Sequence, residues 1–169
     1  MDIINAFQNN VKASLDTILQ IDSQKLLAES SPQDFILDYC LTPLESLGIQ
    51  VLEVEIQKEV QMQFFSLAEQ QKEFVPITTM RDIRDTGRFQ IKLHAKSLTI
   101  EFRASFVFTI HNSRNLEVEH IRIESVKLLK NSLKGSVSMA KRFGAFFKPV
   151  AQSSLASIMV ETIKRLLLG

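Results

Sequence analysis

A strict alternation of apolar and polar side chains over residues 52–64 is the feature that most constrains the fold. Apolar residues occupy the even positions, apart from Lys58, and Glu or Gln occupies the odd positions. A repeat of two residues is that of a β-strand with one buried face. We therefore predict a long, half-buried strand whose apolar positions are Leu52, Val54, Ile56, Val60, Met62 and Phe64.

Three further segments repeat this pattern. Residues 89–94 alternate, and residues 98–110 have an unbroken apolar face on their even positions. Residues 116–123 indicate a fourth strand, whose phase slips near His120 as it does at a β-bulge. The polar residues 68–88 are predicted to form a long loop. The four segments predict a four-stranded antiparallel meander with long strands, one apolar face and one face rich in charge.

Helical spacing precedes the strands. The apolar stripe of residues 2–20 predicts an amphipathic helix. Ser31 and Pro32 are typical of the N-cap and first turn of a second helix. Pro43 should interrupt that helix because it lacks the amide hydrogen that a helix interior needs. Gly48 is a plausible stop because glycine readily ends a helix in the left-handed conformation.

Taken together, residues 1–169 are predicted to form a single α+β domain. Residues 1–48 are expected to be helical, residues 50–130 to form the antiparallel sheet, and residues 136–168 to form basic amphipathic helices divided by Pro149. The apolar face of the sheet has to be covered, so we expect the C-terminal amphipathic helices to pack on it. A chain of this length has room for one substantial core.

The Phe-rich sheet face has two possible uses. Helices can fill the space over it completely, or a sheet wrapped around a long helix can enclose a pocket for an apolar ligand. The same side chains line the core in one case and the pocket in the other. These residues are Phe102, Phe106 and Phe108.

The net charge of +1 conceals an uneven distribution. Residues 1–78 contain four Lys and twelve Asp or Glu, whereas residues 79–169 contain sixteen Lys or Arg and seven Asp or Glu. This distribution suggests an anionic partner for the C-terminal half. Alternatively, the two halves complement each other within the fold or across a dimer.

A second feature of the C-terminal half is a segment that mixes basic residues with Phe. An interfacial membrane helix uses such a mixture, with rings entering the acyl boundary and cations meeting anionic headgroups. The alternative is a helix whose Phe side chains are core and whose cations are solvated. The predicted membrane or anion contacts are Lys141, Arg142, Phe143, Phe146, Phe147 and Lys148.

Signatures of an enzyme are missing from the sequence. There is no Gly-rich phosphate loop and no nucleophile elbow, and His94, His111 and His120 have no metal-ligand spacing. The lone Cys40 lies on an apolar helical face, where a thiol is inert. Residues 81–88 alternate Arg and Asp, which indicates an exposed turn rather than a phosphate site. We predict no catalytic residue, no cofactor and no metal, and nothing favours nucleic acid as a partner.

The sequence therefore predicts a non-enzymatic binding protein. The leading hypothesis is a peripheral membrane protein or one that handles a lipid or another hydrophobic ligand. The alternative is a protein-interaction module, such as an assembly factor or chaperone, that oligomerises through sheet edges. A single cysteine, the lack of a basic N-terminal leader and the lack of a long apolar span favour a cytoplasmic location, with association to a membrane surface in the first case.

Overall fold

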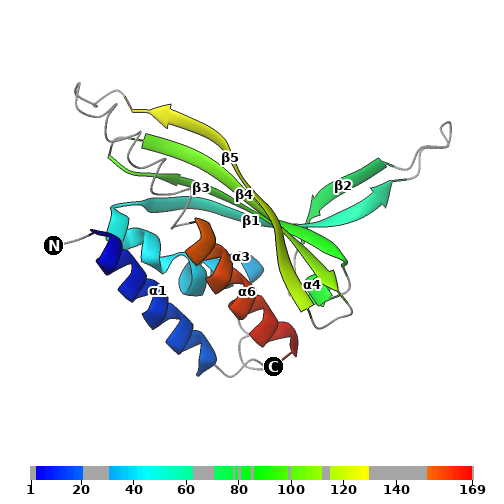
Figure 1. The fold of residues 1–169 in the computed structure, drawn as a ribbon. Helices are drawn as coiled ribbons and strands as arrows, with labels where there is room; N and C mark the ends of the chain where they lie inside the picture. The colour runs from blue at the N-terminus through cyan, green and yellow to red at the C-terminus, as the bar shows by residue number, and fades with distance from the viewer. Residues whose placement is uncertain are drawn as a thin grey trace.

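The computed structural model shows an α+β fold in which helices pack against an antiparallel sheet (Figure 1). It describes residues 3–20, 31–62, 71–77, 79, 81–84, 86–98, 100–111, 115–129 and 152–168. The elements are α1 (Ile3–Leu19), α3 (Pro32–Cys40), the 3-10 helix η1 (Thr42–Leu47), β1 (Gln50–Met62), β2 (Gln71–Pro76), α4 (Arg81–Arg84), β3 (Arg88–Lys96), β4 (Ile100–His111), β5 (Asn115–Leu128) and α6 (Gln152–Leu168).

The sheet has five strands in the order β2-β1-β3-β4-β5, and all neighbours are antiparallel. The four predicted strands correspond to β1, β3, β4 and β5, and they are neighbours in the predicted order. The prediction of a four-stranded sheet was wrong, because residues 68–88, which were predicted to form only a loop, contain β2 and α4. β1 pairs with β3 as far as Lys58 and with β2 from Gln57 onward. The β1–β2 hairpin consequently projects beyond the other strands (Figure 1).

Register shifts leave one residue without a cross-strand partner at three points, Leu52 in β1 and Glu119 and Glu124 in β5. The shift at Glu119 confirms the bulge predicted near His120. The shift at Leu52 was not predicted: Val51 packs against the core, whereas Leu52 is exposed. An extra residue resets the alternation of side chains, so each bulge decides which residues face the helices.

The turn between β3 and β4 corrects one further expectation. Leu98 was expected to begin the apolar face of β4, but it lies in the turn and is 90% exposed. The Ser97 amide donates to the Ile100 carbonyl at 2.7 Å, so the turn closes at Ile100 and the strand begins there.

The helical signals in the N-terminal part are confirmed. The Ser31 side chain accepts a hydrogen bond from the Asp34 amide, with Pro32 in the first turn of α3. The α-helix ends before Pro43, where η1 takes over. Gly48 ends η1 with φ of 71°, a conformation that a side chain with a Cβ disfavours.

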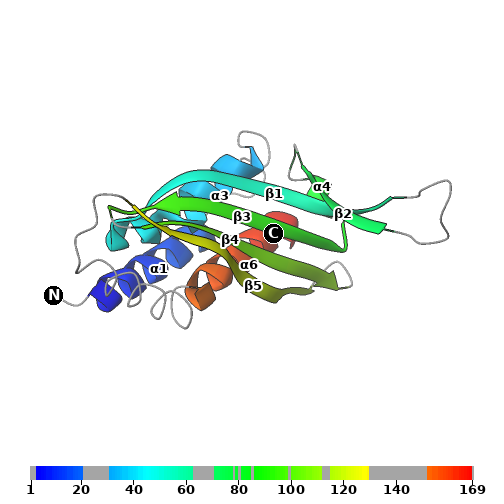
Figure 2. The same ribbon diagram turned by 90° about the horizontal axis from the view of Figure 1, so that it is seen from above.

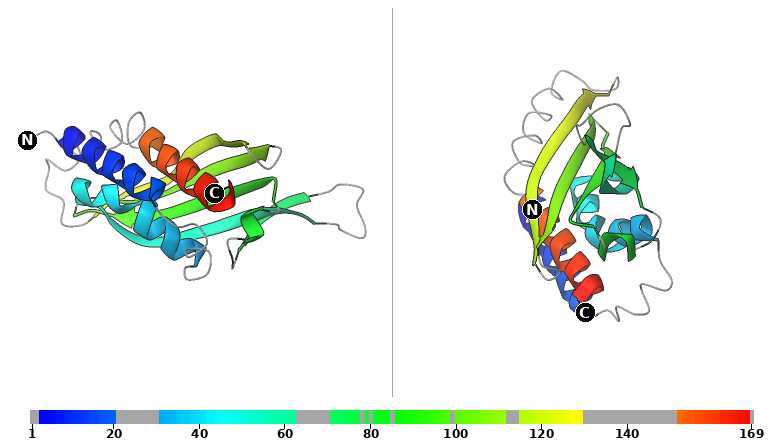
Figure 3. Two further views of the ribbon diagram at one scale, coloured as in Figure 1. Left: turned by 90° about the horizontal axis from the view of Figure 1, so that it is seen from below. Right: turned by 90° about the vertical axis from the view of Figure 1, so that its right-hand side faces the viewer.

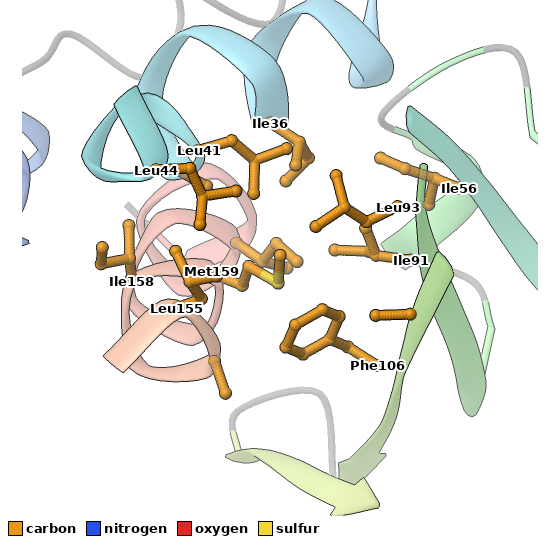
Figure 4. Packing of buried hydrophobic residues seen from close by; sticks show 14 of the residues in the cluster. Ile36, Leu41, Leu44, Ile56, Ile91, Leu93, Phe106, Leu155, Ile158 and Met159 are labelled. Atoms are coloured by element: carbon orange, nitrogen blue, oxygen red, sulfur yellow. The ribbon is translucent and has the colours of Figure 1, made fainter. Parts of the chain in front are cut away.

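Helices α1, α3 and α6 lie on one side of the sheet (Figures 1 and 2). Figure 4 shows side chains of α3, η1 and α6 meeting those of β1, β3 and β4 in a continuous apolar core. The C-terminal helix α6 also contacts α1, α3 and β5. None of the described helices is long and apolar enough to cross a membrane.

Candidate functional site

The predicted Phe residues of the sheet lie in the core. Phe102, Phe106 and Phe108 are each at most 1% exposed and belong to the main apolar cluster. Phe108 also stacks on Phe89, with 5.0 Å between ring centres. None of the hollows described below is lined by these side chains. The Phe-rich face of the sheet is therefore packed against protein.

The predicted membrane contacts fall in a part of the chain outside the described residues. They are Lys141, Arg142, Phe143, Phe146, Phe147 and Lys148. Contact of this segment with a membrane stays a prediction that rests on the sequence.

Cys40 packs at the junction of α3 and α6. Its side chain is completely buried, and its thiol donates to the Thr162 hydroxyl at 3.3 Å. Burial raises the pKa of the Cys40 thiol to about 12, although the hydrogen bond to Thr162 opposes that change. A protonated, inaccessible thiol is a poor nucleophile and a poor metal ligand, so its position indicates a packing role.

The polar face of the sheet is held together by a group that we call the Arg88 cluster. The Arg88 guanidinium donates from Nε and Nη2 to the two Glu119 carboxylate oxygens at 2.7 and 2.9 Å. Its Nη1 donates to Glu59 at 2.5 Å. The Thr109 hydroxyl donates to Glu119 at 2.9 Å, and the Lys72 ammonium lies 3.7 Å from Glu59. These five residues come from five different strands.

The electrostatics of this face follow from those contacts. Arg88 also lies over the Phe74 ring at 5.5 Å, within the range of a cation–π interaction. Hydrogen bonds from Arg88 hold the pKa of the Glu119 carboxyl below its ordinary value. Likewise, a 2.6 Å contact with the His94 ring lowers the pKa of Glu101. Each of these carboxylates has a cation or hydrogen-bond donor beside it.

A small hollow of about 160 Å³ lies on the same polar face. It combines carboxylates with cations, and Glu55 of β1 stands opposite Lys92 of β3 in the register. The positive and negative side chains offset one another, so the hollow has no strong preference for a ligand of one sign. Its lining residues are Glu53, Glu55, Lys92, Leu93, His94, Arg103, Ala104 and Glu124.

Two larger hollows lie on the helical side of the molecule, on either side of a stripe that we call the acidic ridge. The ridge consists of Asp38, Thr42 and Glu45, which line both hollows. One hollow, of about 340 Å³, lies between the ridge and α1, and its lining is polar and apolar in equal parts. Its other residues are Asn10, Ala13, Ser14, Thr17 and Tyr39.

The second hollow, of about 520 Å³, lies between the ridge and the start of β1. Its lining is also mixed: Leu41 and Ile49 are buried, whereas Leu37 is 39% exposed. Figure 3 shows α1, α3 and the start of β1 side by side on this side of the molecule. The remaining lining residues are Gly48, Gln50 and Val51.

Among the described residues, no ion pair offsets the negative charge of the acidic ridge. Residues 31–57 contain five Asp or Glu and no Lys, Arg or His. Within the described part of the chain, neither Asp38 nor Glu45 forms an ion pair, and both residues are exposed. Asp38 also lies in the last turn of α3, where the helix dipole disfavours a carboxylate.

The sequence analysis missed both of these surfaces. Residues 81–88 were interpreted as an exposed turn, but Arg88 begins β3 and joins Glu59 and Glu119, which are 29 and 31 residues away in the sequence. One sequence signal for the acidic ridge was the absence of Lys, Arg and His from residues 31–57. Its spacing of 38, 42 and 45, close to one and two helical turns, was a second signal.

Comparison with protein-family models, with curated proteins and with solved structures found no match for this chain. The candidate function consequently rests on the geometry of its own surfaces.

Proposed function

We propose that this chain is a non-enzymatic binding protein that engages a protein partner through its exposed surface. The observation that carries this proposal is the pair of open hollows along the acidic ridge, outside the apolar core. The Phe-rich sheet face, which first suggested an internal pocket for a lipid, is occupied by packing against α3, η1 and α6.

The chemistry of the ridge suits a protein surface better than a lipid interior. Interfaces combine an apolar centre with a polar margin. The larger hollow offers both kinds of surface, the partly exposed Leu37 and the exposed carboxylates of Asp38 and Glu45. A purely apolar ligand would strip water from two carboxylates without replacing their hydrogen bonds.

Oligomerisation through a sheet edge is the form of interaction that the sequence first suggested, and along β5 it is less favoured. β5 is an edge strand, and two bulges interrupt its ladder. Its exposed residues include charges of both signs. Bulges and charged side chains protect an edge strand against pairing with another chain. We therefore place the partner at the ridge rather than along β5.

Native mass spectrometry of gently purified full-length protein tests the proposal. We expect the chain either in a complex of fixed stoichiometry with another polypeptide or as a defined oligomer, without a bound small molecule. A co-purified mass in the phospholipid or fatty-acid range, lost on denaturation, would overturn the proposal and restore lipid handling as the function.

Membrane contact is a second candidate, which one sequence observation favours: Lys141, Arg142 and Lys148 lie among Phe143, Phe146 and Phe147. Each basic residue near an anionic surface contributes roughly 1 kcal/mol. Replacing the three Phe residues by Ser should then abolish co-sedimentation with phosphatidylserine vesicles. The matched control replaces the buried Phe102 by Leu. Unchanged binding of the triple Ser variant would rule this candidate out.

A further inference from the structure

We infer that the outer edge of β2 pairs with β2 of a second copy of this chain. The two strands run antiparallel about a two-fold axis, so that the two sheets join into one. β2 pairs with the far end of β1, away from the acidic ridge, and the inference therefore goes beyond the proposed function. It combines the projecting hairpin, the backbone groups along β2 and the charges that decide the register.

The β1–β2 hairpin has room for a third strand. Beyond Lys58 the described part of β1 pairs with β2 alone, so Glu59–Met62 and Gln71–Phe74 form a two-stranded ribbon (Figure 1). Such a ribbon is marginally stable in water, whereas three or more strands stabilise one another. Since β2 is the outer strand of the sheet, a strand added on its outer side would complete the ribbon.

The backbone groups of β2 alternate in direction. The Ile77 amide donates to the Ile56 carbonyl at 3.0 Å, which makes these residues a hydrogen-bonded pair of the hairpin. In an antiparallel ladder such pairs recur at every second residue. The odd-numbered residues of β2 therefore direct their backbone groups toward β1, whereas Lys72, Phe74 and Pro76 direct theirs outward. The outer row supplies amide donors at Lys72 and Phe74 and a carbonyl acceptor at every position.

β2 differs from β5, the other edge strand of the sheet. The pairing of β2 with β1 runs without a register shift, whereas two shifts interrupt β5. Pro76 has no amide and Lys72 is charged, and both features restrict pairing at an edge. They do not close this edge, because the Pro76 carbonyl still accepts and the Lys72 amide still donates. They limit the registers in which a second strand can bind.

The side chains select one of the registers whose axis passes through residues 72–76. Axes through Lys72 or Glu73 place two like charges directly opposite each other, which is destabilising. Axes through Val75 or Pro76 form fewer hydrogen bonds, because Pro76 then takes a central position and supplies no amide. With the axis through Phe74, the two Phe74 residues exchange both backbone hydrogen bonds, and each Lys72 amide donates to Pro76 of the other copy.

This register also brings opposite charges together. Lys58 stands opposite Val75 in the hairpin, on the face of β1 that carries Ile56. Glu73 of the second copy would stand on the other side of Val75, with its Cα atom roughly 10 Å from that of Lys58. The two long side chains together span that distance. Neither Lys58 nor Glu73 forms an ion pair among the described residues, so each is available to the other copy.

Phe74 is oriented for this contact before any pairing. The Arg88 guanidinium lies over its ring at 5.5 Å, and Phe74 is half-buried. Aromatic side chains that stand opposite each other stabilise a pair of antiparallel strands. A second β2 would also cover apolar surface that Phe74, Val75 and the exposed Pro76 leave in water. The edge therefore gains burial as well as hydrogen bonds.

Sedimentation equilibrium of the full-length chain over a range of concentrations tests the inference. We expect a monomer–dimer equilibrium for the natural chain. Lys72→Pro removes an outward amide at each end of the shared ladder, but it leaves the bonds to β1 in place because residue 72 exchanges none with β1. It should raise the dissociation constant of the dimer roughly tenfold, equivalent to about 1.4 kcal/mol.

The matched control is Lys72→Ala, which removes the same side chain but keeps the outward amide. Its dissociation constant should change less than about twofold, because Lys72 faces the uncharged Pro76 of the second copy. Circular dichroism checks that both variants keep the fold. Equal weakening by the two variants would overturn the inference, since the side chain rather than the edge would then carry association. A natural chain that stays monomeric across the whole concentration range would overturn it as well.

Cysteine crosslinking tests the register even where Lys72→Pro perturbs the fold. In the inferred register, residue 73 faces residue 75 of the second copy as a non-hydrogen-bonded pair, with Cα atoms about 4.5 Å apart, within disulfide range. A mixture of Glu73→Cys and Val75→Cys chains, oxidised with copper phenanthroline, should yield mainly the mixed disulfide. Each variant alone is the control, and the natural Cys40 is completely buried. A predominant disulfide between two Glu73→Cys chains would overturn the register.

The remaining outcomes separate this inference from the proposed function. A complex with a different polypeptide that Lys72→Pro abolishes would overturn the second copy as the occupant of β2 and leave the proposed function intact. A dimer that Lys72→Pro leaves unchanged would overturn the inference alone. A co-purified lipid in the native mass spectrum would overturn the proposed function and leave the dimer through β2 in place.

Discussion

The polar face of the sheet and the acidic ridge both carry carboxylates, but they differ in what surrounds them. On the sheet face, Glu59 and Glu119 share one guanidinium, and Glu101 contacts a histidine ring. On the ridge, Asp38 and Glu45 have no such neighbour in the part of the chain that is described. The same side-chain type thus occurs in two electrostatic settings within one molecule.

This difference separates residues that hold the fold from residues that are available to a partner. A carboxylate that accepts hydrogen bonds from neighbouring strands stabilises their register, and its removal leaves a cation unpaired. A carboxylate without neighbours contributes little to folding, and its field extends into solvent. We therefore expect stability to depend on the Arg88 cluster and binding to depend on the ridge.

The largest expected effect on stability comes from Arg88→Met, which keeps the aliphatic length over Phe74 but removes the guanidinium. Glu59, whose side chain is only 12% exposed, loses its closest donor. We expect the free energy of unfolding to fall by about 1–2 kcal/mol. This is the contribution of a charge-assisted hydrogen bond, reduced because Arg88 is partly exposed to solvent. Urea unfolding followed by circular dichroism measures this change.

Lys72→Met is the matched control for Arg88→Met. It removes another cation near the same Glu59 carboxylate, but Lys72 is 65% exposed and lies 3.7 Å away. Exposed pairs of this kind contribute about 0–1 kcal/mol, so the free energy of unfolding should change less than in Arg88→Met. If the two variants lose the same stability, the contacts of Arg88 stabilise the fold no more than an exposed ion pair does.

The pH dependence of the Arg88 cluster gives a second prediction. The pKa of Glu119 is lower in the folded protein than in the unfolded chain. The contribution of Glu119 to stability is therefore present above its pKa in the unfolded chain, and it is lost as pH falls through its lower pKa in the folded protein. The difference in unfolding free energy between the natural chain and Arg88→Met should consequently shrink as pH falls from 7 to 3. Urea titrations at both pH values measure it. A difference independent of pH would assign the effect of Arg88 to packing.

The sequence predicted the parts of this fold that local patterns determine. The alternation around Val54 and Ile56, the N-cap at Ser31 and the bulge near His120 all depend on neighbours within a few residues. By contrast, β2 has only six residues without a clear alternation, and it forms a strand because β1 extends past β3 and offers an edge to pair with. Tertiary context overrode the local preference.

The candidate sites were harder to predict because they depend on long-range geometry. Arg88 reaches Glu119 across β4, and a bulge in β5 shifts the register at that point. The acidic ridge has a hollow on each side only because α1 and the start of β1 flank α3 and η1. Spacing within one helix indicates which residues share a face, but it does not indicate what lies beside that face.

The smallest expected effect on stability belongs to Asp38→Asn/Glu45→Gln. Substitutions at exposed sites without specific contacts usually change stability by less than about 0.5 kcal/mol. Here the sign should be favourable, because Asn at position 38 no longer opposes the dipole of α3. Urea unfolding should therefore show equal or slightly higher stability than the natural chain. A loss of more than about 1 kcal/mol would mean that the ridge carboxylates hold the fold as the Arg88 cluster does, and the division between a structural surface and a binding surface would fail.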